Sequence, residues 1–143
     1  MRTAIITDSN SGVTAQEARR LGVWVVPMPI IVDSRTRFEG VDLFAEEFYR
    51  LLAQGHSVST SQPAPGDLTG LWDRVLAEGW DEIVYIPMSS GLSSSCQTAA
   101  ILAAAYEGRV QVADNHQISV PQKNAVRDAA ALAAAGLPAA AIR

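Results

Sequence analysis

Short apolar runs alternate with segments of helical periodicity along the whole chain. Runs rich in β-branched and aromatic residues predict strands over residues 3–6, 23–32, 83–88 and 110–113. Apolar positions spaced three and four apart predict helices over residues 14–21, 42–55, 67–77 and 98–106, with further helix after Asn124. Strands that alternate with helices are typical of an α/β fold, an open and mainly parallel sheet with helices on both faces.

Several residues mark where these elements begin, end or break. Thr14 and Glu17 have the spacing of a capping box, while Asp42 and Asp67 are predicted to cap the next two helices. Pro27 and Pro29 interrupt the second predicted strand, which favours an edge strand or a bulge. Residues 33–38 are predicted to form a polar turn, whose two arginines suit either an exposed hairpin tip or a phosphate contact. Residues 57–66 contain two prolines and are predicted to lack regular structure.

The segment from Ile83 to Thr98 is the strongest candidate for a functional site. An apolar strand leads into Ser89-Ser90-Gly91-Leu92-Ser93-Ser94-Ser95, and an alanine-rich helix follows. A helix start offers backbone N–H groups without intrahelical partners, and serine hydroxyls add further donors. The pattern therefore predicts an anion or carboxylate site. The alternative is that one serine caps the helix and the others only fill the loop.

A second polar cluster, residues 7–12, follows the first strand. Asp8 in this cluster is either catalytic or, together with Ser9, a partner for loop amides that pins neighbouring loops. Polar clusters after parallel strands are expected on one rim of the sheet, where open α/β proteins hold ligands. His56 stands alone between a helix and a loop, so we expect a solvent-facing or hydrogen-bonded residue rather than a base.

Composition limits the classes of function. The 143 residues suit about one domain, and the net charge of −4 without a basic cluster disfavours nucleic acid as a partner. The apolar stretch at residues 21–32 contains a glycine and two prolines and is too short to span a membrane. The amino terminus lacks the apolar core of a signal peptide. A single cysteine excludes internal disulfides and zinc frameworks, so we expect a cytoplasmic chain without a metal site.

Four motifs in order resemble the DegV family of bacterial lipid-binding proteins. They are Thr7-Asp8-Ser9, Thr60-Ser61-Gln62-Pro63, Pro87-Met88-Ser89-Ser90-Gly91-Leu92-Ser93 and Val112-Ala113-Asp114. The resemblance implies a protein without catalysis of its own that binds one long-chain fatty acid, such as palmitate, and needs no other cofactor. It also implies that a separate fatty-acid kinase is a partner that receives the bound acid.

The resemblance assigns the carboxylate of the fatty acid to the hydroxyls of Thr60 and Ser93. Ser61, Ser90 and Gly91 would lie close by in the same two serine-rich loops. The chemistry agrees, because a carboxylate away from water needs two or three donors, and hydroxyls with helix N–H groups supply them without a buried cation.

Two departures from the family are expected to matter. Members are about twice as long, with a second domain that closes over the acyl chain and supplies a histidine near the carboxylate, and nothing after Val120 resembles it. The segment Val120-Pro121-Gln122-Lys123-Asn124 replaces a stretch that usually contains glycines. We therefore expect residues 1–143 to be a single α/β lipid-binding domain that resembles the amino-terminal half of the family.

Without the second domain, the apolar walls of the ligand pocket would be exposed to water, which would favour a homo-oligomer. We expect the alanine-rich tail, residues 125–141, or the pocket face to form its interface. The alternative is that the tail only covers the sheet of its own subunit.

Two other functions stay open. Ser93 could be the nucleophile of a hydrolase or transferase with His56 or His116 as its base, although no Gly-x-Ser-x-Gly motif surrounds a serine. The chain could also be an oligomerisation module that binds no ligand.

Overall fold

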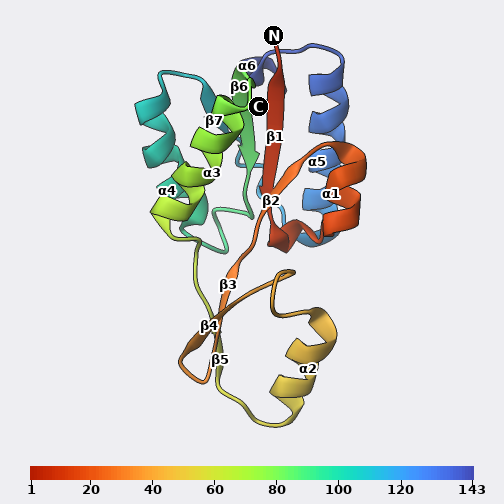
Figure 1. Cartoon of the computed structure of the whole chain (residues 1–143), viewed down its shortest axis with the longest axis vertical. Coiled ribbons are helices and arrows are strands. Elements are labelled where there is room, and N and C mark those ends of the chain that lie inside the picture. The colour runs from red at the N-terminus through yellow and green to blue at the C-terminus, as the bar shows by residue number, and fades with distance from the viewer.

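The structure is a computed structural model that describes residues 1–143, and its larger part is a parallel α/β sheet (Figure 1). All neighbouring strands of this sheet run parallel, in the order β2-β1-β6-β7. Its strands are β1 (Thr3–Asp8), β2 (Trp24–Val26), β6 (Glu82–Ile86) and β7 (Val110–Val112). The α/β fold class predicted from the sequence is confirmed, and β2, the first part of the predicted second strand, lies at an edge of the sheet.

Helices cover both faces of the parallel sheet. One face packs against α3 (Pro65–Ala77) and α4 (Ser95–Ala103), which a short 3-10 turn, η2 (Ala104–Tyr106), extends. The other face packs against α1 (Ala15–Leu21), α5 (Ser119–Ala134) and α6 (Ala139–Ile142). Alternate residues of one strand enter opposite cores, since Tyr85 contributes to the first cluster and Val84 to the second. The rings of Trp72 and Tyr85 pack edge to face in the core beneath α3 and α4, with their centroids 5.7 Å apart.

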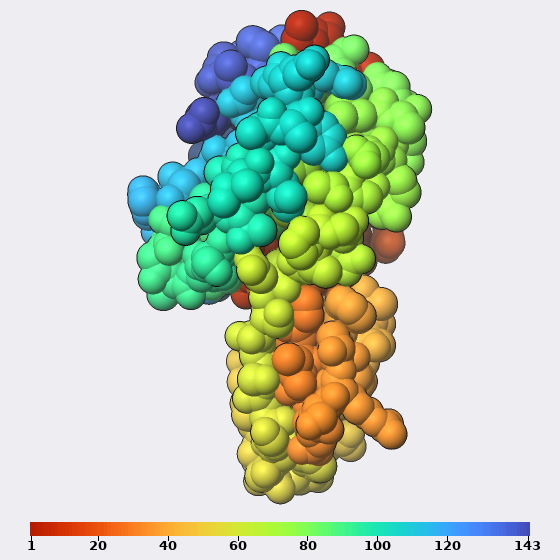
Figure 2. All heavy atoms as spheres, turned by 90° about the vertical axis from the view of Figure 1, so that its left-hand side faces the viewer, coloured from red at the N-terminus to blue at the C-terminus, as the bar shows by residue number.

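A second, antiparallel sheet forms the smaller part of the molecule, below the first in Figures 1 and 2. Its order is β4-β3-β5, with β3 (Pro29–Val32) between β4 (Arg35–Phe38) and β5 (Val58–Thr60). Helix α2 (Ala45–Ala53) covers it and places Phe48 and Leu51 against the buried side chains of Ile30, Val32 and Leu43. The sequence predicted this helix on a sheet, but not the separate sheet it covers.

The antiparallel sheet corrects three sequence predictions. Residues 23–32 are not one strand, because the chain leaves the parallel sheet after Val26 and begins the second sheet at Pro29. Residues 33–38 are a turn only at Asp33 and Ser34, and the remaining four residues form β4, paired with β3. Residues 57–66 are not wholly irregular either, since β5 pairs with β3 before the first proline is reached.

Both aspartates predicted as helix caps have other positions. Helix α2 begins at Ala45, and Asp42 instead accepts a hydrogen bond from the Phe38 N–H over 2.6 Å. Helix α3 begins at Pro65, which suits proline because the first turn needs no N–H, so Asp67 lies inside the first turn. The capping box of Thr14 and Glu17 is confirmed.

The helices flanking the last strand begin earlier than predicted. Helix α4 begins at Ser95 rather than Thr98, and α5 begins at Ser119 rather than near Asn124. The predicted break at Gly136 and Pro138 separates α5 from α6. None of the helices is long and apolar enough to cross a membrane.

Candidate ligand site at the strand ends

The candidate site lies where the parallel strands end, on the side that faces the antiparallel sheet (Figure 1). Three polar segments meet at this rim: the 3-10 turn η1 (Ser9–Ser11) after β1, the serine loop (residues 89–95) after β6, and residues 114–118 after β7. Hydrogen bonds between the segments confirm that they converge, as the sequence pattern predicts.

Asp8 links the first segment to the serine loop. One oxygen of its buried carboxylate accepts the Met88 N–H over 2.8 Å, and the other accepts the Asn10 N–H over 3.0 Å. Burial raises the pKa of Asp8, although these hydrogen bonds oppose the shift. Of the two interpretations of Asp8, pinning of neighbouring loops accounts for these bonds.

Ser9 makes the corresponding link to the antiparallel sheet. Its hydroxyl oxygen accepts the Met28 N–H over 2.9 Å, and its hydroxyl donates to Glu39 over 2.9 Å. Ser9 thereby joins the rim of the parallel sheet to the connection between β2 and β3, where the antiparallel sheet begins.

The serine loop is ordered mostly by its own residues. Ser89 is buried; its carbonyl accepts the Leu92 N–H over 3.0 Å and its hydroxyl oxygen accepts the Gly91 N–H over 3.1 Å. The hydroxyl oxygen of Ser93 accepts the Ser95 N–H over 3.1 Å, at the start of α4. Ser94, at the cap position, makes no side-chain capping bond. One serine, Ser93, therefore bonds the start of the helix, as the alternative of a capping serine predicts. This role uses only the hydroxyl oxygen of Ser93 and leaves its hydrogen free.

Asp114 holds the tip of the loop from the end of β7. Its carboxylate accepts the Ser90 N–H over 3.3 Å and the His116 N–H over 3.3 Å. Hydrogen bonding from Ser90, chiefly from its side chain, lowers the pKa of Asp114. Ser90 is therefore already engaged by a carboxylate of the protein.

Thr60 is the last residue of β5 rather than part of a loop, and Ser61 follows it directly. Thr60 pairs with Ile30, is exposed, and has a hydroxyl that makes no hydrogen bond within the chain. The hydroxyl of Ser61 donates to the Gln62 carbonyl over 3.1 Å. Of these two side chains, Thr60 is the one left free to donate to a ligand.

The two halves of the candidate site belong to different sheets. The segment that follows Thr60 and the serine loop both lie at the junction of the two sheets in Figures 1 and 2. No hydrogen bond joins Thr60 to Ser93, and neither residue lines the two cavities whose walls include the neighbouring segments. One, of about 490 Å³, is lined by Ser90, Cys96 and Asp114 among others, and another, of about 320 Å³, by Pro27, Pro29 and Pro63 among others.

Gln122 is a rim residue that the sequence did not indicate as part of the site. Its side chain is fully buried, and its Nε2 lies 3.0 Å from the Asp8 carboxylate, 3.1 Å from the Thr7 hydroxyl oxygen and 3.2 Å from the Ile86 carbonyl. It lies in the segment that departs from the family pattern, so the motifs gave no signal for it. Its position in the first turn of α5, beside an aspartate after the first strand, becomes evident only in three dimensions.

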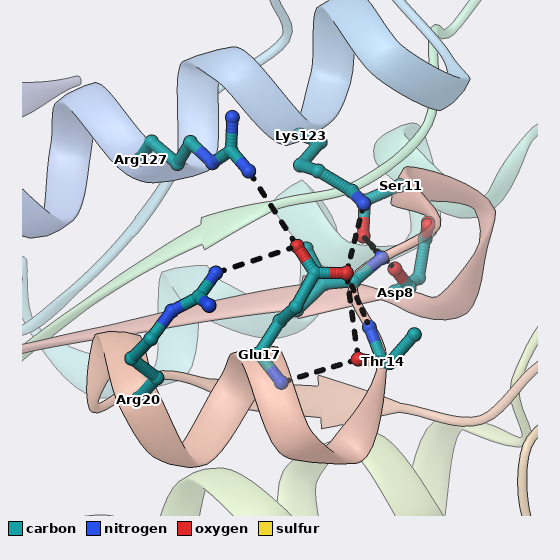
Figure 3. A network of polar contacts seen from close by, with 8 residues as sticks. Asp8, Ser11, Thr14, Glu17, Arg20, Lys123 and Arg127 are labelled. Carbon is teal, nitrogen blue, oxygen red and sulfur yellow. Dashed lines mark hydrogen bonds and ion pairs between the residues drawn. The ribbon is translucent and has the colours of Figure 1, made fainter.

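An ion cluster fixes α5 beside this position (Figure 3). Glu17 of α1 receives Lys123 Nζ over 2.9 Å and Arg127 over 3.6 Å, while Arg20 lies at 4.0 Å. The hydrogen bond from Lys123 is the main reason that the pKa of Glu17 is lowered. The residue next to Gln122 therefore attaches α5 to α1.

Comparison with protein families gives a match over nearly the whole chain. The family model described as "Uncharacterised protein, DegV family" matches residues 2–143. A DegV domain-containing protein of Listeria monocytogenes is 34% identical over 119 residues, which cover 82% of this chain and 42% of that protein. One from Deinococcus radiodurans is 33% identical over 137 residues, 95% of this chain and 48% of that protein. The chain spans less than half the length of these two curated relatives.

Solved structures give the same result. A DegV family protein from Thermus thermophilus, described by its fatty acid binding, superposes with a TM-score of 0.89 at 29% identity, over 99% of this chain and 51% of that one. A fatty acid binding DegV family protein from Streptococcus agalactiae gives a TM-score of 0.85 at 28% identity, over 99% and 51%. The sequence motifs, the two sheets and these matches agree, and the chain belongs to the DegV family.

Proposed function

We propose that residues 1–143 act as one lipid-binding domain, in which the hydroxyls of Thr60 and Ser93 hold the carboxylate of a long-chain fatty acid. The observation that carries the proposal is the state of these two hydroxyls. The Thr60 hydroxyl makes no hydrogen bond, and the Ser93 hydroxyl only accepts one, from the Ser95 N–H. Each therefore has its hydroxyl hydrogen free to donate to a ligand.

The other three proposed residues contribute differently. Ser61 donates to Gln62, Ser90 is bonded to Asp114, and the Gly91 N–H is used by Ser89. We propose that they shape the site around the carboxylate rather than donate to it directly.

Charge supports a site made of hydroxyls. The carboxylates of Asp8 and Asp114 at this rim are both occupied by hydrogen bonds from the chain itself. The start of α4 beside Ser93 adds the positive end of a helix dipole, which favours an anion. A carboxylate can then be satisfied without a buried cation.

The solved relatives support the ligand class. The Thermus thermophilus and Streptococcus agalactiae proteins, both described as fatty acid binding, share this fold at 29% and 28% identity. The acyl chain adds about 0.8 kcal/mol for each CH₂ that becomes buried, so affinity depends on how much of the chain is covered. Ser90, Gly91 and Leu92 are exposed, which leaves the carboxylate end accessible to a fatty-acid kinase as the proposed partner.

The positions of the histidines disfavour a serine hydrolase. His56 Nδ1 lies 2.5 Å from the Asp33 carboxylate on the antiparallel sheet, and His116 Nδ1 lies 3.7 Å from Asp114. Neither imidazole hydrogen-bonds a serine hydroxyl, which a Ser–His pair requires.

Native mass spectrometry of the delipidated chain with palmitate and with hexadecanol tests the proposal. The two ligands have the same chain length, but only palmitate has a carboxylate. We expect a one-to-one palmitate adduct and a much weaker hexadecanol adduct. Absence of a palmitate adduct would overturn fatty-acid binding, and equal adducts would overturn carboxylate recognition.

A further inference from the structure

We propose that Gln122 is a positioning residue for the serine loop and acts on it through Asp8. This inference rests on the proposed function, because it concerns the loop that would hold the carboxylate. Gln122 lies on α5, at a distance in sequence from both Asp8 on β1 and the loop after β6.

The first step is the bond between Gln122 and Asp8. The Nε2 group has two hydrogens and three acceptors within 3.2 Å: the Asp8 carboxylate, the Thr7 hydroxyl oxygen and the Ile86 carbonyl. The opposite orientation of the amide would point its oxygen at a carboxylate and a carbonyl, so the acceptors fix the orientation. The amide oxygen consequently remains buried without a partner. A buried polar atom left unpaired is costly, so this arrangement persists only because the Nε2 bonds are favourable.

The second step leads from Asp8 to the loop. The oxygen of Asp8 that does not face Gln122 accepts the Met88 N–H over 2.8 Å. Met88 directly precedes Ser89, whose carbonyl and hydroxyl organise the turn that leads to Ser93. Gln122 therefore fixes the orientation of the carboxylate that holds the first residue before the loop.

The third step is the position of Gln122 itself. Lys123 and Arg127 attach the same turns of α5 to Glu17, and Val126 is fully buried in the adjoining core. These contacts of α5 do not involve the loop (Figure 3), although the Gln117 carbonyl, just before α5, also accepts the Ser89 N–H over 2.8 Å. Helix α5 provides a support from which the amide can orient Asp8.

Amide hydrogen exchange at Met88, compared with amides of β1, measures the effect without a ligand. Gln122→Met keeps the length of the side chain and removes the donor, and Gln122→Glu keeps its shape and places a second acidic group against Asp8. We expect Met88 protection relative to β1 to fall by roughly tenfold to a hundredfold in Gln122→Met and further in Gln122→Glu at pH 7. Gln16→Met, at an exposed glutamine of α1, should leave it unchanged.

Two further measurements separate positioning from general stability. In an Asp8→Asn background, Gln122→Met should change Met88 protection little, since the carboxylate through which it acts is gone. Palmitate affinity should fall at least tenfold in Gln122→Met and remain at the wild-type value in Gln16→Met. Unchanged Met88 protection, additive effects of the two substitutions, or loss of protection with full palmitate affinity would each overturn the proposal. If the wild-type chain binds no palmitate, the proposed function fails, while the exchange measurements still decide whether Gln122 positions the loop.

Discussion

The hydroxyl oxygen of Ser9 accepts a hydrogen bond from the backbone N–H of Met28 over 2.9 Å, and this bond joins the rim of the parallel sheet to the connection that leads into the antiparallel one. Met28 is buried, so its N–H has no ready replacement partner in water. The relative placement of Thr60 and Ser93 depends on contacts of this kind, because the two residues belong to different sheets.

Ser9→Ala should therefore destabilise the protein by about 1–3 kcal/mol, the cost of leaving a buried donor unpaired. Thermal or urea denaturation measures the change. Ser94→Ala is the matched control, since Ser94 is exposed and its side chain makes no capping bond. Equal stability of the Ser9 variant and the wild type would show that the bond to Met28 is dispensable.

Thr60→Val should weaken palmitate binding by about 1.5–3 kcal/mol, the usual contribution of a hydrogen bond to a charged group. The substitution keeps the volume and the β-branched shape, which suits the strand end, so the melting temperature of the ligand-free protein should change little. Titration calorimetry gives the affinity. Thr36→Val, at an exposed threonine of β4 in the same sheet, should bind like the wild type. A loss of melting temperature that is equal with and without palmitate would instead show Thr60 to be structural.

Glu17 should contribute stability that depends on pH. Its pKa in the folded protein is lowered, first by the hydrogen bond from Lys123, so its contribution is present above the ordinary value of 4.5 and is lost as the pH falls through the folded value. Glu17→Gln should melt at a lower temperature than the wild type at pH 7, and the difference should disappear in acid. Glu46→Gln, at an exposed residue of α2 without an ion pair, should follow the wild-type curve throughout. A Glu17→Gln difference that persists at low pH would contradict the ionic origin.

Self-association is expected to use the pocket face rather than the buried side of the tail. Helix α5 packs Val126 and Ala129 against its own sheet, whereas Leu92 in the serine loop and Val120 in the first turn of α5 are exposed, at 63% and 61%. We predict a homodimer at micromolar concentration that Val120→Asp dissociates. Light scattering gives the mass, and a wild-type mass near 15.2 kDa would exclude the dimer.

The parallel sheet and the start of α1 were predictable because their signals are local. The capping box of Thr14 and Glu17 and the apolar run from Ile83 to Ile86 each act within a few residues. The convergence of polar segments at the strand ends follows from parallel topology, so the rim was predictable as well.

The antiparallel sheet was not predictable in the same way, because pairing between distant segments creates it. Strand β4 has the sequence Arg-Thr-Arg-Phe, which is polar enough to suit a turn until β3 pairs with it. Asp42 has the composition of a helix cap, but the Phe38 N–H takes its carboxylate. Gln122 acts across more than a hundred residues of sequence, and no local pattern indicates such a contact.

The antiparallel sheet and its helix are formed by one continuous segment of the chain, residues 29–64. The two connections that join this segment to the parallel sheet line the same cavity through Pro27, Pro29 and Pro63. Proline fixes its own φ angle at both connections, so the angle between the two sheets can change only through the remaining backbone torsions. A carboxylate bonded to both Thr60 and Ser93 would cross-link the two sheets directly. The affinity for the head group and the angle between the sheets are then thermodynamically linked. A partner that binds the smaller sheet and rotates it would therefore change the affinity for the ligand without contacting either hydroxyl.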